Sequence, residues 1–171
     1  IFNYVDTTTR KPSLPIFMTE TLSEVHYRQK PKARREIIRG NRVSGVENES
    51  ITQFMGDMYQ NVNIYENYLE LFGKNFTSPI ADGGKAHYDY LLVDSNWVGR
   101  NWCYLIRFKP KHRQQLCFTG EMWINDTSFA VRRIEGGIEP GTNVNFFQEL
   151  RVRQEYEEVA REVWMLTRDE L

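Results

Sequence analysis

The sequence lacks long apolar runs, a strong charge of one sign and more than a pair of cysteines. Its longest apolar run is the stretch 102–106, far short of the about 20 residues that cross a bilayer as a helix. The formal net charge of −1 argues against a dedicated nucleic-acid binder, which is usually clearly basic. Two cysteines, Cys103 and Cys117, are too few for a disulfide scaffold and lack metal-ligand spacing. At most one disulfide can form within the chain.

Motifs that carry chemistry are also missing. The chain contains no His-Glu-x-x-His or paired Cys-x-x-Cys for zinc, no phosphate-binding loop and no Gly-x-Ser-x-Gly elbow. Residues 94–99 open like a calcium loop, but Val98 occupies a ligand position and Leu105 stands where the bidentate glutamate belongs. The glutamates between 155 and 162 lie beside arginines, as expected of a solvated face. We therefore predict a protein that is not an enzyme and has no cofactor or metal site.

The composition that remains is that of a folded domain. Of the 171 residues, 40% are hydrophobic and 13% aromatic, which is enough to form a core. Residues 1–15, with two prolines, predict an N-terminal arm or linker, and residues 16–171 predict a single domain. Because the chain begins at Ile1 rather than Met, we expect it to be a segment excised from a longer precursor.

Strands separated by turns dominate the predicted structure. Residues 16–28 and a stretch through Ile37, Ile38 and Val43 predict two strands, joined by a turn at residues 30–32. Further strands then recur about every ten residues, which favours an antiparallel meander. They are predicted at residues 87–94, 101–109, 115–125 and 128–138.

The stretch 50–73 is the one with the clearest helical pattern. Ser50 can cap a first helix, with Gln53 as its capping-box partner. Apolar residues then fall on one helical face, at Ile51, Phe54, Met55 and Met58. A break at residues 61–63 separates a second predicted helix, residues 64–72, which ends at Gly73.

The register of the central hairpin follows from its apolar pattern. Placing Cys103 opposite Cys117 keeps the large apolar side chains on one face, whereas a shift by one residue would mix the two faces. That face carries Trp102, Tyr104, Ile106, Phe108, Leu116, Phe118 and Met122. The same register places Cys103 and Cys117 where a cross-strand disulfide is geometrically conceivable. The alternative is two small, half-buried thiols.

The C-terminal stretch 148–163 can be interpreted in two ways. Val152, Tyr156, Val159 and Val163 recur at helical spacing, so the pattern by itself favours a helix. The alternative is a strand, a turn at residues 160–162 and a returning strand.

Two basic turns share one pattern, Arg-x-Lys-Pro-Lys-x-Arg, at residues 28–34 and 107–113. One interpretation is a pair of solvated turns. The other is a pair of cationic fingers that contact anionic lipid headgroups or an acidic partner, at about 1 kcal/mol for each cation near a charged membrane. The predicted contact residues are Lys30, Lys32, Arg34, Lys109, Lys111 and Arg113.

A family resemblance covers nearly all of the chain from Pro12 on. It rests on the run FMTETLSEVHYRQKPKARREIIRG and its continuation to residue 84, and on DYLLVDS, WCYLIRFKPK, FTGEMWINDTSFAVRRIE and WMLTRDEL. The chain resembles a family of Bacteroidota outer-membrane proteins of unknown function. Their precursors carry a carboxypeptidase-regulatory-like β-sandwich, then this module, then a membrane β-barrel. The resemblance implies a location on the periplasmic side of the Gram-negative outer membrane, within a larger exported protein. The resemblance also implies that the protein is attached to the membrane through the β-barrel of the precursor and not through this segment.

The second half is also similar to the lipoprotein-carrier fold of LolA and LolB, an antiparallel half-barrel with helices on its open side. That similarity implies a hairpin at residues 160–162 and makes residues 50–73 the covering helices. It implies a concave apolar face that could bind a lipid or lipoprotein, with the side chains Trp102, Tyr104, Ile106, Phe118 and Met122.

These observations together predict an α+β fold, a curled antiparallel sheet with two or three helices covering one side. The predicted function is a non-catalytic periplasmic interaction module of an outer-membrane β-barrel protein, with a role in envelope assembly or partner binding. The alternative is a lipid or acyl-chain carrier, and a hydrolase whose groups converge only in space is a distant third. An apolar cavity of roughly 300 Å³ or more would favour the carrier, and a packed core with an exposed apolar patch would favour the interaction module.

Overall fold

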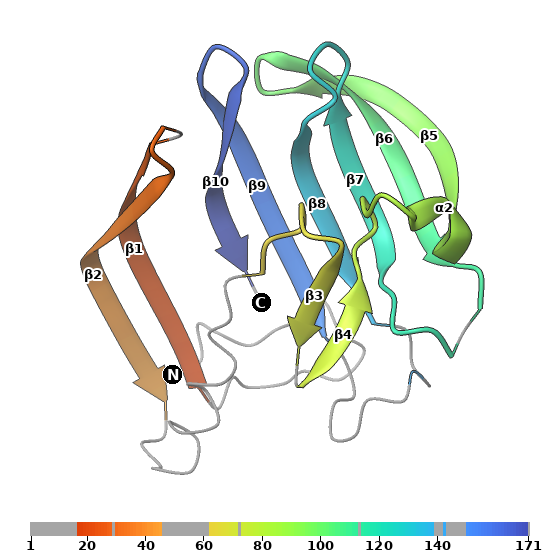
Figure 1. Cartoon of the computed structure of the whole chain (residues 1–171), viewed down its shortest axis with the longest axis horizontal. Helices are drawn as coiled ribbons and strands as arrows, with labels where there is room; N and C mark the ends of the chain where they lie inside the picture. The colour runs from red at the N-terminus through yellow and green to blue at the C-terminus, as the bar shows by residue number, and fades with distance from the viewer. Residues whose placement is uncertain are drawn as a thin grey trace. The chain divides into compact units, whose positions relative to one another are not determined.

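The computed structural model describes residues 17–28, 30–45, 62–71, 73–112, 114–138, 142 and 150–170. The chain divides into two compact units, residues 1–57 and residues 58–171, and each is described here by itself. Among the described residues, the elements are strands and one helical turn, α2 (Gly84–His87) (Figure 1). Residues 1–15 lie outside the described residues, so the N-terminal arm remains a prediction.

The described part of the first unit is one long antiparallel hairpin of β1 (Phe17–Arg28) and β2 (Ala33–Gly45). Both strands and the turn between them agree with the sequence prediction. The pairing shifts where Leu22 lies opposite Gly40 and Ser23 opposite Ile38, so that Arg39 forms a bulge. Nearly every side chain of the hairpin is exposed or only half-buried.

The second unit is built on a six-stranded antiparallel sheet with the order β10-β9-β8-β7-β6-β5. Each strand pairs with its neighbour in the sequence, which confirms the predicted meander, and Figure 1 shows the twist of this sheet. The strands are β5 (Tyr88–Val98), β6 (Asn101–Pro110), β7 (Thr119–Asn125), β8 (Val131–Gly137), β9 (Arg151–Ala160) and β10 (Val163–Glu170). In this order β5 and β10 are the two edge strands.

A small hairpin, β3 (Tyr68–Leu71) and β4 (Lys74–Thr77), covers part of one face of the sheet. Its side chains alternate between buried and exposed, with Leu69 and Leu71 inside, as a strand on an apolar surface requires. Phe76 of β4 is fully buried and packs against Phe118, with 5.3 Å between ring centroids. The hairpin therefore closes the core that the sheet begins.

The predicted α+β class is wrong, because the described chain is almost entirely antiparallel β-structure. Where the sequence predicted a second helix at residues 64–72, the chain makes a turn and then forms β3. Tyr65 and Tyr68 would lie on the apolar stripe of that helix, yet both are more than half exposed, while Leu69 and Leu71 are buried at a spacing of two. Tertiary packing thus overrides the local helical pattern. The first predicted helix, at residues 50–61, lies outside the described residues.

The predicted register of the central hairpin is also wrong, although its assignment of faces holds for Ile106 and Met122, which lie opposite each other. Cys103 is paired with Asn125, eight residues beyond Cys117. The reason is a long β6–β7 connection, in which Cys117 makes a bridge with Thr77 of β4 before β7 begins. The observed pairing differs from the predicted one by eight residues, an even number, so each side chain stays on the face to which it was assigned. Cys103 and Cys117 are therefore not opposite each other. Each is a buried free thiol, and no disulfide joins them.

The C-terminal stretch forms the β9–β10 hairpin, with its turn at residues 161–162. The helix favoured by the local pattern is therefore wrong, and the hairpin implied by the carrier similarity is confirmed. Val152, Gln154 and Tyr156 are buried at a spacing of two, so the periodicity that matters here is that of a strand. In the described part of the chain, no helix has the length and apolarity that crossing a bilayer would take.

Candidate binding surface

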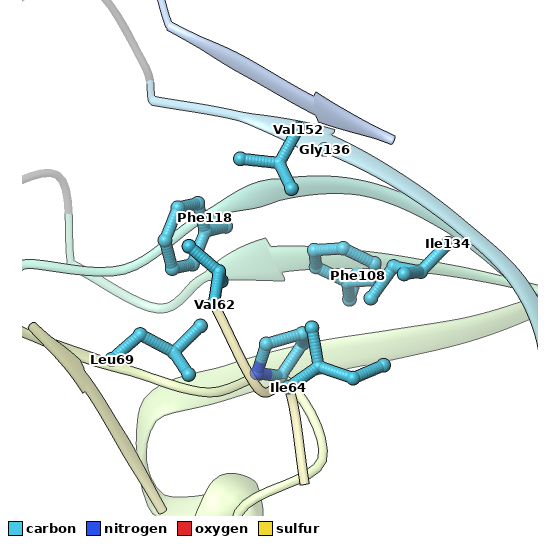
Figure 2. A pocket seen from close by; sticks show the side chains of 9 residues that line it. Val62, Ile64, Leu69, Phe108, Phe118, Ile134, Gly136 and Val152 are labelled. Atoms are coloured by element: carbon cyan, nitrogen blue, oxygen red, sulfur yellow. The ribbon is translucent and has the colours of Figure 1, made fainter. Parts of the chain in front are cut away.

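The space between the sheet and its covering segment is small. It is an apolar cavity of about 20 Å³, lined on the side of the sheet by Phe108, Phe118 and Ile134 and on the side of the covering segment by Val62, Ile64 and Leu69 (Figure 2). A volume of this kind accommodates about one water molecule, whereas ligand pockets start at roughly 300 Å³. Where this cavity lies, the described part of the sheet is packed against its covering segment, and the cavity itself has no room for an acyl chain.

The predicted concave-face residues divide into two groups along the sheet. Phe118 lines the cavity, Met122 is buried beside it, and Ile106 packs at the border of the core. Tyr104 and Trp102 lie farther along β6, outside the cavity lining, and Tyr104 is 37% exposed. The structure thus does not bring the five predicted residues together in one pocket.

Sequence reasoning missed most of the cavity lining. Phe108 was assigned to this face of the sheet, and the lining residues that were not are Val62, Ile64, Leu69, Pro79, Ile134, Gly136 and Val152. Those on β8 and β9 recur at a spacing of two, a signal that was present in the sequence but was interpreted as helical in β9. On the covering segment, Leu69 alternates with Leu71 in the same way, but Val62 and Ile64 lie outside the strands, and their position depends on long-range contacts with the sheet.

Buried polar groups attach the covering segment to the sheet. Gln154 Nε2 donates hydrogen bonds to the Val62 carbonyl at 2.7 Å and to Asp169 Oδ1 at 3.1 Å, while its Oε1 accepts one from the Tyr156 hydroxyl at 2.9 Å. The Tyr88 hydroxyl donates to the Thr77 carbonyl at 2.5 Å. Because these groups are buried and mutually satisfied, they fix one arrangement of the core.

Burial also determines the state of the thiols. It raises the pKa of Cys103, and it raises the pKa of Cys117, whose thiol also interacts with Tyr88 and Thr77. Both groups are therefore thiols rather than thiolates at neutral pH. Among the described residues, no group of three or more His, Cys, Asp or Glu side chains could hold a metal ion.

Among the described strands of the second unit, the edge strand β5 carries the most exposed large apolar side chains. We call the β5 apolar strip the side chains Leu91, Leu92, Val93 and Trp97. Leu91 is 60% exposed, and Leu92 and Trp97 are each 63% exposed. The strip covers both faces of the sheet, because Leu91 lies opposite Arg107 and Leu92 lies opposite Ile106. Val93, between Leu92 and Asp94, has no partner on β6 and forms a bulge.

The two predicted basic turns belong to different units. Lys30 and Lys32 are exposed at the β1–β2 turn, and Arg34 of β2 donates to Glu36 at 3.3 Å. In the second unit, Lys109 is exposed and Lys111 Nζ donates to the Lys85 carbonyl at 2.6 Å. Arg113 lies outside the described residues. Residues 17–45 contain seven Lys and Arg but three Asp and Glu, so the first hairpin is basic.

The face of the six-stranded sheet that points away from the core carries ion pairs between side chains of several strands. Glu155 is the least exposed of the ion-paired acids in the described chain, and it pairs with Arg153 at 2.8 Å and with Arg133 at 3.3 Å. Burial alone would raise the pKa of Glu155, but the Arg153 hydrogen bond and the guanidinium charges of Arg133, Arg153 and Arg132 lower it. This carboxylate therefore stabilises the folded state above its unfolded pKa, and that contribution is lost as the pH falls.

We expect a Glu155→Gln variant to have a lower urea midpoint than the wild type at pH 7, and the difference to shrink as the pH falls toward 3. The reason is that acid protonates the wild-type carboxylate and removes its advantage. Glu66→Gln, at an exposed carboxylate, is the control and should leave the midpoint unchanged at both pH values. A difference that stays constant with pH would show that Glu155 acts through packing alone.

The fold and this surface define a β-sheet domain with a closed core and an exposed apolar edge. By sequence, the chain belongs to a family of unknown function, DUF5686, which matches residues 4–171. No curated protein and no solved structure matches it. The expectation of an unknown-function family is thus confirmed, and the relation to Bacteroidota outer-membrane proteins and to the LolA fold remains a prediction.

Proposed function

We propose that this chain is a non-catalytic interaction module that binds a protein partner through the β5 apolar strip. The observation that carries the proposal is an edge strand with large apolar side chains exposed on both faces. Natural proteins usually protect such edges with charged side chains, prolines or a covering element, because an open edge invites pairing with other chains. An exposed apolar edge is therefore typical of an interface.

The opposite edge of the same sheet makes the contrast clear. Strand β10 begins with four apolar residues, of which Val163 is exposed and the next three are half-buried, and it ends with Thr167, Arg168, Asp169 and Glu170, a run of polar and charged side chains suited to solvent. On β5 the central residues are instead Leu91, Leu92 and Val93. Full burial of one such side chain contributes about 1.5–3 kcal/mol, so the strip could supply much of the free energy of a specific complex.

The small size of the cavity supports an interaction module over a lipid carrier. At about 20 Å³ it falls far below the volume that an acyl chain would fill. By the resemblance stated above, we place the module on the periplasmic side of the outer membrane, within a larger exported protein. Its role there would be partner binding or envelope assembly.

The basic β1–β2 hairpin offers a second contact of different chemistry. Its turn presents Lys30 and Lys32 to solvent, and cations of this kind attract acidic protein surfaces or anionic headgroups. We assign to it an auxiliary role in association, sensitive to ionic strength, because exposed charges are screened by salt.

The proposal is tested by placing a photo-crosslinking amino acid at Leu92 in the intact protein as its host makes it. We expect a discrete adduct with a protein that mass spectrometry identifies. The same probe at Val159, which is also more than half exposed but lies in the β9–β10 hairpin at the other side of the sheet from β5, is the matched control and should give no such adduct. Equal labelling from both positions, or adducts with lipid alone at Leu92, would contradict the proposal.

A further inference from the structure

The backbone of β5 is open along only part of its length. In the part of the chain that the structure describes, β5 pairs on one side only, with β6. In its second half, the Ser95 N–H donates to Asp94 Oδ1 at 2.7 Å and the Trp97 N–H donates to Asn96 Oδ1 at 2.8 Å. These side chains occupy backbone donors that an added strand would need. The open segment of the edge is therefore residues 89–93.

From this geometry we infer that the partner binds residues 89–93 of β5 as an added strand, and that it is an extended apolar segment flanked by basic residues. The inference rests on the proposed function and specifies its partner. Strand addition obtains its affinity from main-chain hydrogen bonds and its specificity from neighbouring side chains. The two local hydrogen bonds beyond Asp94 and the bulge at Val93 end the pairing and set its length.

The side chains along the open segment define the apolar part of the partner. Leu91 projects on the face of Arg107 and Leu92 on the face of Ile106, so both faces of an added strand would meet an apolar neighbour. An alternating apolar and polar strand would satisfy only one of these faces. The segment that fits best has several consecutive apolar residues.

The charges along the open segment indicate which side chains should flank the apolar residues of the partner. Strand β5 contains Asp89 and Asp94, one at each end of the apolar run, and no Lys or Arg. Asp94 lies opposite Leu105, so β6 provides no cation across from it, whereas Asp89 lies opposite Lys109. Basic residues flanking the partner segment would complement these carboxylates in either strand direction. A second copy of the chain, paired β5 to β5, would bring the same two acids and no cation.

The test uses a fluorescent peptide, Lys-Lys-Val-Ile-Val-Val-Lys-Lys, and measures its binding to the protein by fluorescence anisotropy. We expect saturable binding to the wild type. The Leu92→Lys substitution should raise the dissociation constant about tenfold or more, which corresponds to about 1.4 kcal/mol. Val159→Lys, an exposed apolar-to-lysine change away from the edge, is the matched control and should bind like the wild type. Circular dichroism confirms that both variants fold.

Two comparison peptides separate the parts of the inference. The same peptide with N-methyl groups on alternate backbone amides keeps its side chains but loses donors, and we expect it to bind about tenfold more weakly. Equal binding of this peptide would overturn strand addition. A version flanked by glutamates should also bind more weakly, and equal binding would overturn the basic flanks.

The result also separates this inference from the proposed function. If a protein crosslinks at Leu92 but none of the three peptides binds, strand addition by this class of segment is wrong and the interaction surface stands. If no peptide binds and light scattering shows a dimer that Leu92→Lys dissociates, the occupant is a second copy. If no crosslink, peptide binding or dimer is found, both proposals are wrong.

Discussion

Replacing Phe76 with Ala is expected to lower the free energy of unfolding by about 3–5 kcal/mol. Phe76 is 0% exposed and is the residue of β4 that packs on Phe118 of the sheet. Its loss would leave a cavity at the contact that holds the covering hairpin in place. Urea denaturation followed by tryptophan fluorescence measures the change.

Phe129→Ala is the matched control for this prediction. Phe129 is 73% exposed in the β7–β8 turn, so its truncation should change stability by no more than about 0.5 kcal/mol. Equal effects of the two substitutions would show that β3 and β4 do not close the core as described.

Replacing Gly120 with Ala is expected to lower the melting temperature by about 6–12 °C, from a loss of about 3 kcal/mol in a chain of this size. A Cβ at Gly120 would lie 2.6 Å from Gly136 Cα and closer still to the Glu135 carbonyl oxygen, both on the neighbouring strand β8. Backbone atoms in the middle of a sheet cannot move aside cheaply. The paired glycines also leave space for the Phe108 ring, which lies 3.2 Å from the position of a Cβ at Gly136.

Calorimetry on Gly120→Ala measures this shift, with Gly83→Ala as the control. A Cβ at Gly83 meets nothing within 4 Å, so that variant should melt close to the wild type. If Gly120→Ala also melts like the wild type, the close approach of β7 and β8 is wrong.

Much of the sheet could be predicted from the sequence, because short-range patterns determine it. Turn residues recur about every ten positions, and the strands 87–94, 101–109 and 128–138 are found close to where they were predicted. The register could not be predicted, because it depends on the length of the β6–β7 connection, in which Cys117 makes a long-range bridge with Thr77 of β4. This register also determines the positions of the two thiols, because it pairs Cys103 with Asn125 rather than with Cys117.

The candidate site was harder to predict than the strands. Phe118 and Met122 were assigned correctly to the face that forms the core, but sequence cannot show whether such a face encloses a void. The β5 apolar strip was missed for a related reason. The pattern Leu91-Leu92-Val93 is typical of a strand buried on both faces, and only the strand order shows that this strand is an edge.

The central claim is that the protein has a closed core and binds at its edge, and native mass spectrometry of the domain purified from a bacterial periplasm tests it most directly. The account predicts the mass of the polypeptide alone, with no lipid in an organic extract and no uptake of added phospholipid. A stoichiometric lipid that co-purifies with the domain, and that is lost in a folded Tyr104→Glu variant, would contradict it and restore the carrier function.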